Sequence, residues 1–228
     1  MSNLTDEAIG ASPPMQGAAL ARRPAPGTRE RILRVASELF NQHGVRAVGL
    51  QQVVDETGLG KSLLYREFAS KDDLVVAWLH AMRAIWWEQT GKVIERYPDD
   101  PARQLLGIVE MVRDDVSANG YFGCVYHNTN AEFRDPQHPG HQESVQHARE
   151  IRKQLRDLAK AAGVRNPAEL GDQLLLVIDG IYASGAVLGP SGPARMGVDV
   201  AAELIRQHAG ATRHPAARSR RSAASVRT

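Results

Sequence analysis

The sequence predicts an all-α protein, with an N-terminal three-helix head joined to a larger helical body. Apolar residues recur three and four positions apart through most of residues 28–208, which is the spacing of a buried helix face. Glycine, proline and asparagine interrupt this spacing at intervals, where helices are expected to end and begin. No segment of useful length alternates apolar and polar residues as a half-buried strand would.

Changes in composition divide the chain into four segments. Residues 1–26 and residues 210–228 lack periodicity and are rich in small, polar or basic residues, which predicts a disordered arm and a disordered basic tail. Between them, residues 27–87 are expected to form the head and residues 88–209 the body.

The overall composition is that of an ordinary soluble protein. The chain has 228 residues, of which 43% are hydrophobic and 24% charged, so it can bury a substantial core. No uninterrupted apolar run approaches the roughly 20 residues that span a bilayer, and the N-terminus lacks the features of a secretion signal. We therefore expect a cytoplasmic protein without a membrane partner. The single cysteine agrees with a reducing compartment.

The first predicted helix covers residues 28–43. Its apolar residues form one stripe, made of Ile32, Val35, Ala36, Leu39 and Phe40. Thr28 is expected to cap its start and Gly44 to close its end.

A helix-turn-helix unit is predicted over residues 49–68. Leu50, Val53 and Val54 mark the buried face of its first helix, and Gly58 can adopt the left-handed conformation that ends it. The second helix starts at Lys61 and turns Leu64 and Phe68 inward, leaving outward the polar residues Lys61, Ser62, Tyr65 and Arg66. Such a helix can enter the major groove of DNA, although an ordinary helical corner with a solvated face has the same spacing.

The body is predicted to consist of helices alone. A long helix begins at the capping residue Ser70 and ends before Pro98. Pro101 opens the next, and a shorter segment covers residues 124–134. After the breaker of residues 135–140, a long amphipathic helix runs to Gly163, followed by a helix that begins at Pro167 and a last helix over residues 193–208.

The head resembles that of the TetR family of bacterial transcriptional regulators. The likeness rests on LFNQHG at residues 39–44 and GLGKSLLYREFASKDDL at residues 58–74, about a quarter of the chain. The resemblance implies that Lys61 begins the recognition helix and that Tyr65 and Lys71 grip phosphates. It also implies that Ser62, Leu63 and Arg66 can reach base edges and that Gln51 adds a phosphate contact.

The sequence departs from the family pattern at several positions. Val48, Gly49 and Gly60 stand where the family usually has hydroxyl-bearing residues, so two side-chain caps are missing. Leu63 replaces a frequent threonine, and it can either touch a thymine methyl group or pack inside the head. Arg22 and Arg23 could reach DNA from the arm, or serve only to keep it soluble.

The last two helices are expected to form a homodimer interface. The segment of residues 170–188 is apolar around much of its circumference, yet too short and too polar at its ends to cross a membrane. Its small residues would allow close packing in its own domain and with a second subunit. In the TetR family the final two helices commonly form such an interface, and two heads can then read a palindromic operator in double-stranded DNA.

A small-molecule effector is expected to bind inside the body. The candidate lining residues mix aromatic surface with a few polar groups, as ligand pockets often do. They are Trp86, Met111, Phe122, Tyr126, His127, Asn130, Phe133 and Tyr182. Each of them could instead be an ordinary core residue.

No metal, cofactor or catalytic residue is expected. Cys124, His127, His138, His141 and His147 are ligand types that zinc accepts, but their spacing is unlike that of zinc sites, and surface or capping roles are the alternative. Cys124 and His127 lack the third group that an activated nucleophile needs. A redox-sensing role for Cys124 remains a minor hypothesis.

Together these features predict a ligand-responsive transcriptional regulator without enzymatic activity. The mechanism favoured by the resemblance is a repressor that releases its operator when a small molecule fills the body, and activation is left open. The competing interpretation is a helical ligand carrier or enzyme whose head does not bind DNA.

Overall fold

The computed structural model describes residues 27–118 and 120–209, and this part of the chain is helical without strands. This confirms the predicted all-α fold. The helices are α2 (Thr28–His43), α3 (Leu50–Thr57), α4 (Lys61–Glu67), α5 (Lys71–Arg96), α6 (Pro101–Val116), α7 (Val125–Glu132), α8 (Pro139–Ala161), α9 (Pro167–Leu188), the 3₁₀ helix η1 (Pro193–Met196) and α10 (Gly197–His208). The expected arm with Arg22 and Arg23, and the expected basic tail, lie outside the described residues.

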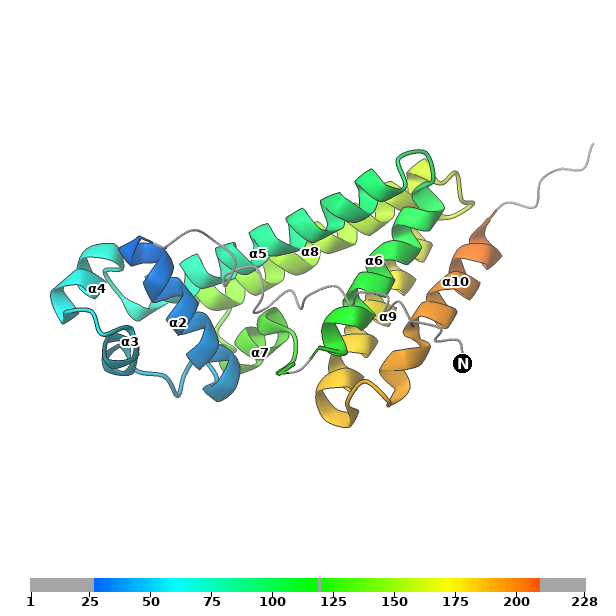
Figure 1. Ribbon diagram of the computed structural model, residues 1–228. Coiled ribbons are helices and arrows are strands. Elements are labelled where there is room, and N and C mark those ends of the chain that lie inside the picture. The colour runs from blue at the N-terminus through cyan, green and yellow to red at the C-terminus, as the bar shows by residue number, and fades with distance from the viewer. Residues whose placement is uncertain (1–26, 119, 210–228) are drawn as a thin grey trace, which may run out of the picture.

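The molecule is elongated, with the head at one end (Figure 1). Helices α2, α3 and α4 form this end, and α5 runs from them beside α8 toward the opposite end. There α6, α9 and α10 pack together, while the short helix α7 lies between the two ends against α8. Helix α5 thus connects the head to the body without a break.

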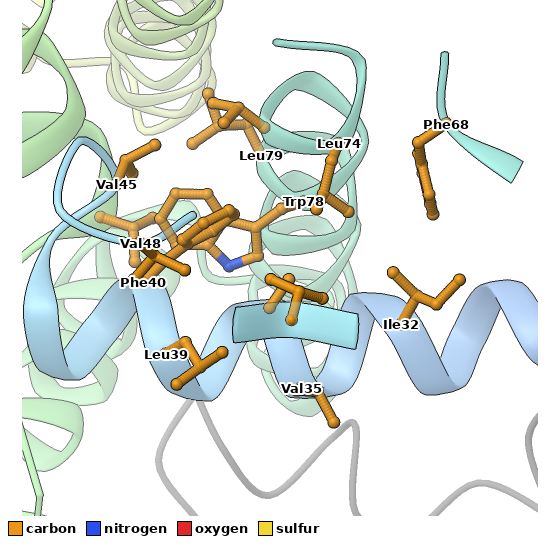
Figure 2. Close-up of a cluster of buried hydrophobic side chains, with 14 of the residues drawn as sticks. Ile32, Val35, Leu39, Phe40, Val45, Val48, Phe68, Leu74, Trp78 and Leu79 are labelled. Carbon is orange, nitrogen blue, oxygen red and sulfur yellow. The ribbon is translucent and has the colours of Figure 1, made fainter. Parts of the chain in front are cut away.

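The head core is closed around Trp78, which α5 inserts between the head helices (Figure 2). The Trp78 indole nitrogen donates to the Ser37 hydroxyl at 3.1 Å, and its ring meets that of Phe40 edge-on with centroids 5.2 Å apart. The predicted stripe of α2 is buried here. Gly44 ends α2 as expected, with a φ of 82° and its N–H donating to the Phe40 carbonyl. Thr28 does not cap this helix, because it is already the first helical residue and Gly27 holds the cap position.

Local capping signals set the bounds of the body helices. The Ser70 hydroxyl accepts from the Asp73 amide at 3.0 Å at the start of α5, and Asp100 does the same for Arg103 at the start of α6. Asn166 caps α9. The last segment differs from prediction, because residues 193–196 form η1 and only Gly197–His208 is α-helical.

Glycines allow α9 to approach its neighbours closely. A Cβ at Gly185 would lie 2.1 Å from a Val116 methyl carbon of α6, and one at Gly171 would lie 2.9 Å from the Arg156 backbone nitrogen of α8. A side chain at either position would therefore push the helices apart. Gly180, in contrast, has nothing within 4 Å of its added Cβ.

Among the described residues, α9 alone is long and apolar enough to cross a membrane, with 22 residues and a mean hydropathy of 1.2 over an 18-residue stretch. The helix begins three residues before the predicted segment of residues 170–188, so its length alone does not exclude a membrane span. Its contacts with α6, α8 and α10 are those of a core helix. Its Asp172 also accepts from Arg152 and Arg156, so the helix carries an ion-paired charge at its first turns.

Candidate functional site

The turn between α3 and α4 is held by hydrogen bonds on both sides of Gly58. Gly58 adopts the left-handed conformation with a φ of 63°, and its N–H donates to the carbonyls of Val54 and Asp55. The Thr57 hydroxyl donates to the Val54 carbonyl at 2.9 Å and accepts from the Leu59 amide at 3.3 Å. The glycine was evident from the sequence, whereas the role of Thr57 was missed.

Helix α4 presents a polar, cationic face to solvent. Leu64 and the following Phe68 are buried in the head core, while Lys61, Ser62 and Arg66 are exposed. Tyr65 is 45% exposed, and the Lys61 ammonium lies 5.8 Å from the centroid of its ring. The face is thus free of contacts that would seal it against the rest of the described chain.

Arg29 of α2 braces the end of α4 and was not anticipated. Its guanidinium lies over the Phe68 ring at 4.4 Å and donates to the Glu67 carbonyl at 2.9 Å. The first contact is a cation–π interaction, and the second satisfies a carbonyl at the helix C-terminus. Arg29 therefore fixes the orientation of α4.

Around α4, the structure agrees with the positions at which the sequence departs from the family pattern. Gly49 and Gly60 hold the cap positions of α3 and α4 without a side-chain hydrogen bond, as the missing hydroxyls imply. Leu63 is half-buried, between the two alternatives left open for it. Gln51 is exposed on α3, with its amide nitrogen donating to Asp55 at 2.9 Å.

Lys71 is less free than a solvent-exposed phosphate contact would be. Its ammonium donates to the Arg46 carbonyl at 3.2 Å, and the side chain is half-buried at the start of α5. Burial lowers its pKa from the ordinary value. An ammonium group has three donors, so this bond leaves others available.

Glu132, at the end of α7, clamps the α2–α3 loop of the head. Its carboxylate oxygens accept from the Val45 amide at 3.0 Å and the Arg46 amide at 2.6 Å. The Arg46 guanidinium in turn donates to the Glu132 carbonyl at 3.3 Å. No local sequence signal indicates this contact, because the partners are 86 and 87 positions apart.

The body contains a partly open cavity of about 180 Å³, lined by side chains of α5, α7, α8 and α9 and by Cys124. Of the residues predicted to line a ligand site, five lie in its wall: Trp86, Tyr126, His127, Asn130 and Tyr182. Much of the remaining wall is apolar, formed by Met82, Val125, Val145, Ile151, Leu175 and Ile178. Ser144, His147 and Asp179 complete its polar part and were not among the predicted residues.

Three predicted lining residues lie outside this cavity. Met111 is half-buried on α6 and borders a separate surface hollow beside Tyr97. Phe122 is 47% exposed in the loop before α7. The Phe133 ring stacks on His138 with centroids 3.7 Å apart and packs against the head core. Aromatic or apolar character alone did not distinguish the inner face of a helix from these other environments.

Burial keeps His147 uncharged. The side chain is 5% exposed, and desolvation, followed by the nearby positive Arg83 and by His127, lowers its pKa to about 3. The Tyr126 ring stacks on the imidazole with centroids 3.7 Å apart. Its Nδ1 atom has no hydrogen-bond partner among the described residues.

Cys124 and the described histidines make separate local contacts. Among the described residues there is no group of three or more His, Cys, Asp or Glu that could hold a metal ion. His138 instead caps α8, accepting from the Gly140 amide at 3.0 Å. Burial raises the pKa of the Cys124 thiol to about 11, which disfavours the nucleophilic thiolate, while His127 lies 3.2 Å from the Asp179 carboxylate.

The family model described as bacterial regulatory proteins, tetR family, matches residues 32–78, which contain α3, α4 and the start of α5. A curated relative is an HTH-type transcriptional regulator of Staphylococcus aureus strain USA300, 38% identical over 53 residues. That stretch covers 23% of this chain and 29% of the relative, so the match spans less than a third of the relative's length.

Solved structures extend the likeness to the body. SCO4454, a TetR-family transcriptional regulator from Streptomyces coelicolor, is similar with a TM-score of 0.77 and 24% identity, over 80% of this chain and 96% of that one. A TetR transcriptional regulator from Legionella pneumophila is similar with a TM-score of 0.69 and 15% identity, over 82% and 100%. At these identities the likeness shows a shared fold. Over residues 32–78 the chain thus matches the tetR family of bacterial regulatory proteins, and its described part shares the fold of TetR-family transcriptional regulators.

Proposed function

We propose that the protein is a cytoplasmic, dimeric repressor that binds a palindromic operator and releases it when a small molecule fills the body cavity. The tetR-family match of residues 32–78 and the shared fold support DNA binding and transcriptional regulation. The observation that carries the proposal is the exposed face of α4, where Lys61, Ser62, Tyr65 and Arg66 face solvent. Helices exposed in this way can place side chains against phosphates and base edges in the major groove.

Exposed apolar side chains support a dimer through α9 and α10. Leu176 and Val187 of α9 are 71% and 82% exposed. Leu188 at the end of α9, Met196 of η1 and Val200 of α10 are exposed as well. Such a concentration of exposed large apolar residues is typical of a protein interface. It lies at the end of the molecule opposite the head (Figure 1), which leaves both heads of a dimer free for DNA.

The dimer is tested by Val187→Glu, which would bury a charge in the interface. We expect the native chain to elute at twice the monomer mass in light-scattering chromatography and the variant to shift toward monomer. Glu169→Gln, at the start of the same helix, is the control and should remain dimeric. A native chain that is monomeric at micromolar concentration would contradict the proposal.

Two helices connect the cavity with the head. Helix α5 contributes Met82 and Trp86 to the cavity wall and Trp78 to the head core. Helix α7 contributes Tyr126 and holds the head loop through Glu132. A ligand shifts the heads only if its affinity differs between the two head arrangements, so α5 and α7 are the elements whose positions must differ.

A gel shift with DNA from beside the protein's own gene tests the function. We expect retention at low ionic strength and loss of sequence preference in Arg66→Ala, because we assign the exposed Arg66 to a base edge. Arg165→Ala removes the same charge from an exposed position between α8 and α9 and should bind like the native chain. Absence of retention on any duplex would favour the alternative, a helical carrier or enzyme with a head that does not bind DNA.

Lys71 provides a second test at the DNA surface. Lys71→Ala should weaken binding to all sequences and reduce the salt dependence, because a lysine that contacts phosphate releases counterions. Equal losses for the Lys71 and Arg66 variants with unchanged salt dependence would contradict the assigned roles.

A further inference from the structure

The body cavity holds a buried polar atom that has no partner in the described part of the chain. His147 lines the cavity and is 5% exposed, and its Nδ1 atom makes no hydrogen bond to described residues. Buried nitrogen atoms are nearly always hydrogen-bonded, because leaving one unpaired is costly. A ligand group that bonds to this nitrogen would remove the cost.

Two hydroxyl groups of the cavity wall, those of Tyr126 and Ser144, are already engaged as donors. The Tyr126 hydroxyl donates to the Leu79 carbonyl at 2.7 Å, and the Ser144 hydroxyl donates to the Gly140 carbonyl at 2.8 Å. His147 differs from both in holding a buried nitrogen without a partner among the described residues. Around it the surfaces are flat, since the Tyr126 ring stacks on His147 and the Trp86 ring meets it edge-on at 5.9 Å. Flat aromatic walls favour a flat aromatic ligand.

The charges of the wall favour an uncharged ligand. The His147 imidazole is neutral, since burial holds its pKa at about 3. Asp179 carries the carboxylate of the wall, and His127 lies 3.2 Å from it. An anion would face this carboxylate, and the nearby cation Arg83 is already paired with Glu143 and Glu150. A cation would lose its hydration and find Asp179 already engaged.

The size of the cavity sets the size of the ligand. Its volume is about 180 Å³, and an apolar protein cavity of roughly 150 Å³ accommodates benzene. One ring with a small substituent therefore fits. A hydroxyl substituent can both donate and accept, so it can bond to His147 in either neutral tautomer.

We infer that the cavity binds an uncharged, single-ring aromatic molecule bearing a hydroxyl group, a phenol in its protonated form. The hydroxyl bonds to His147 and the ring lies among Tyr126, Trp86 and the apolar wall. This inference rests on the proposed function, because it names the class of molecule to which the regulator would respond.

The test compares three probes of similar size on the full chain at pH 7 by isothermal titration calorimetry. Phenol carries the neutral hydroxyl, toluene lacks it, and benzoate replaces it with a charge. We expect phenol to bind roughly 10-fold more tightly than toluene, which corresponds to one well-placed hydrogen bond. Benzoate should bind more weakly than phenol by a similar or larger factor.

His147→Leu should abolish the preference for phenol over toluene, because the apolar side chain offers no hydrogen bond. Gln146→Leu is the matched control, since it makes the same kind of change at the exposed neighbouring position of α8 and should keep the preference. Circular dichroism establishes that both variants fold. The comparison of the three probes on the native chain stands without either variant.

Several results would overturn the inference: no binding of any probe, toluene or benzoate binding as tightly as phenol, or a phenol preference that survives His147→Leu. The gel shift separates this failure from failure of the proposed function. A chain that retains its DNA but shows no phenol preference loses only the ligand class. A chain that binds phenol but no DNA loses the regulatory function.

Discussion

The head and the body differ in how a buried tryptophan is surrounded and in which kind of side chain lies outside. In the head, Trp78 fills the centre of the core and the polar face of α4 lies outside. In the body, an indole of the same size, Trp86, borders a cavity, and large apolar side chains of α9 and α10 lie outside. The head can present one fixed surface to a repeating partner such as DNA. The body keeps unfilled space and uncovered apolar surface, which suit a ligand and a second subunit.

The largest effects on stability are expected when the two tryptophans are replaced, one in the head and one in the body. Both are buried, and each indole nitrogen donates at 3.1 Å, Trp78 to Ser37 and Trp86 to Gln154. Trp78→Ala should lower the free energy of unfolding by about 3–5 kcal/mol, because the closed core cannot collapse around the void. Trp86→Ala should cost at least about 1 kcal/mol less, since one side of this ring faces the cavity and makes fewer contacts with packed side chains. Urea denaturation measures both, and equal losses would contradict the contrast.

The pH dependence of stability should come in part from the body through His147. Its pKa is about 3 in the folded protein against 6.5 for the ordinary side chain. The unfolded chain therefore takes up this proton first, and stability present above pH 6.5 is lost as the pH falls toward 3. At pH 5 the loss from this group is roughly 2 kcal/mol.

Denaturation curves from pH 8 to pH 4 for the native chain and His147→Leu measure this contribution. Other titrating groups are common to both proteins, so the difference between the two curves isolates His147. The native chain should lose more stability on acidification than the variant. Parallel curves would show that the folded protein accepts the proton on His147 without penalty.

Loss of the Glu132 carboxylate, which holds the α2–α3 loop of the head to α7, should lower the free energy of unfolding by an intermediate amount. Glu132→Ala leaves the amides of Val45 and Arg46 without their carboxylate acceptor, which should cost about 1–3 kcal/mol. Hydrogen exchange should accelerate at these two amides. Glu56→Ala, at an exposed position of α3 in the head, is the control and should change neither quantity appreciably. Unchanged exchange at Val45 would mean that the clamp does not hold the loop.

A small loss of stability is expected when the contacts of Arg29 with the end of α4 are removed. Arg29→Ala removes the cation over Phe68 and the bond to the Glu67 carbonyl, and should cost about 0.5–1 kcal/mol. Arg34→Ala, which loses only the exposed pair with Glu38, should cost about 0.3–0.5 kcal/mol. Thermal unfolding of the two variants distinguishes them. A larger loss for the Arg34 variant would remove the role assigned to Arg29.

Reactivity of the thiol adds a check that is independent of stability. Burial raises the pKa of Cys124 to about 11 from an ordinary value of 9.0. The thiolate fraction at pH 7 should then be roughly 100-fold lower, and alkylation by iodoacetamide correspondingly slower than for a free thiol. Rapid alkylation of the folded chain, or loss of an oxidant-dependent DNA release in Cys124→Ser, would instead support the redox-sensing hypothesis.

The sequence by itself determined the helices, their order and the outward face of α4. The signals that set them act within about four residues, as when Gly58 turns the chain, Ser70 caps α5 and Asn166 caps α9. Periodicity then decides which side of each helix is buried. Two predictions were wrong by a few residues: the cap expected at Thr28 lies at Gly27, and the segment expected as one helix is divided into η1 and α10.

Only the tertiary structure decided what the helices enclose and how the regions are joined. The clamp of Glu132, the bond from Lys71 to Arg46 and the unpartnered nitrogen of His147 depend on the packing of helices distant in sequence. For the same reason the predicted lining residues Met111, Phe122 and Phe133 lie elsewhere. An apolar face must be buried, but its partner is set by the close approach of whole helices, as at Gly171 and Gly185.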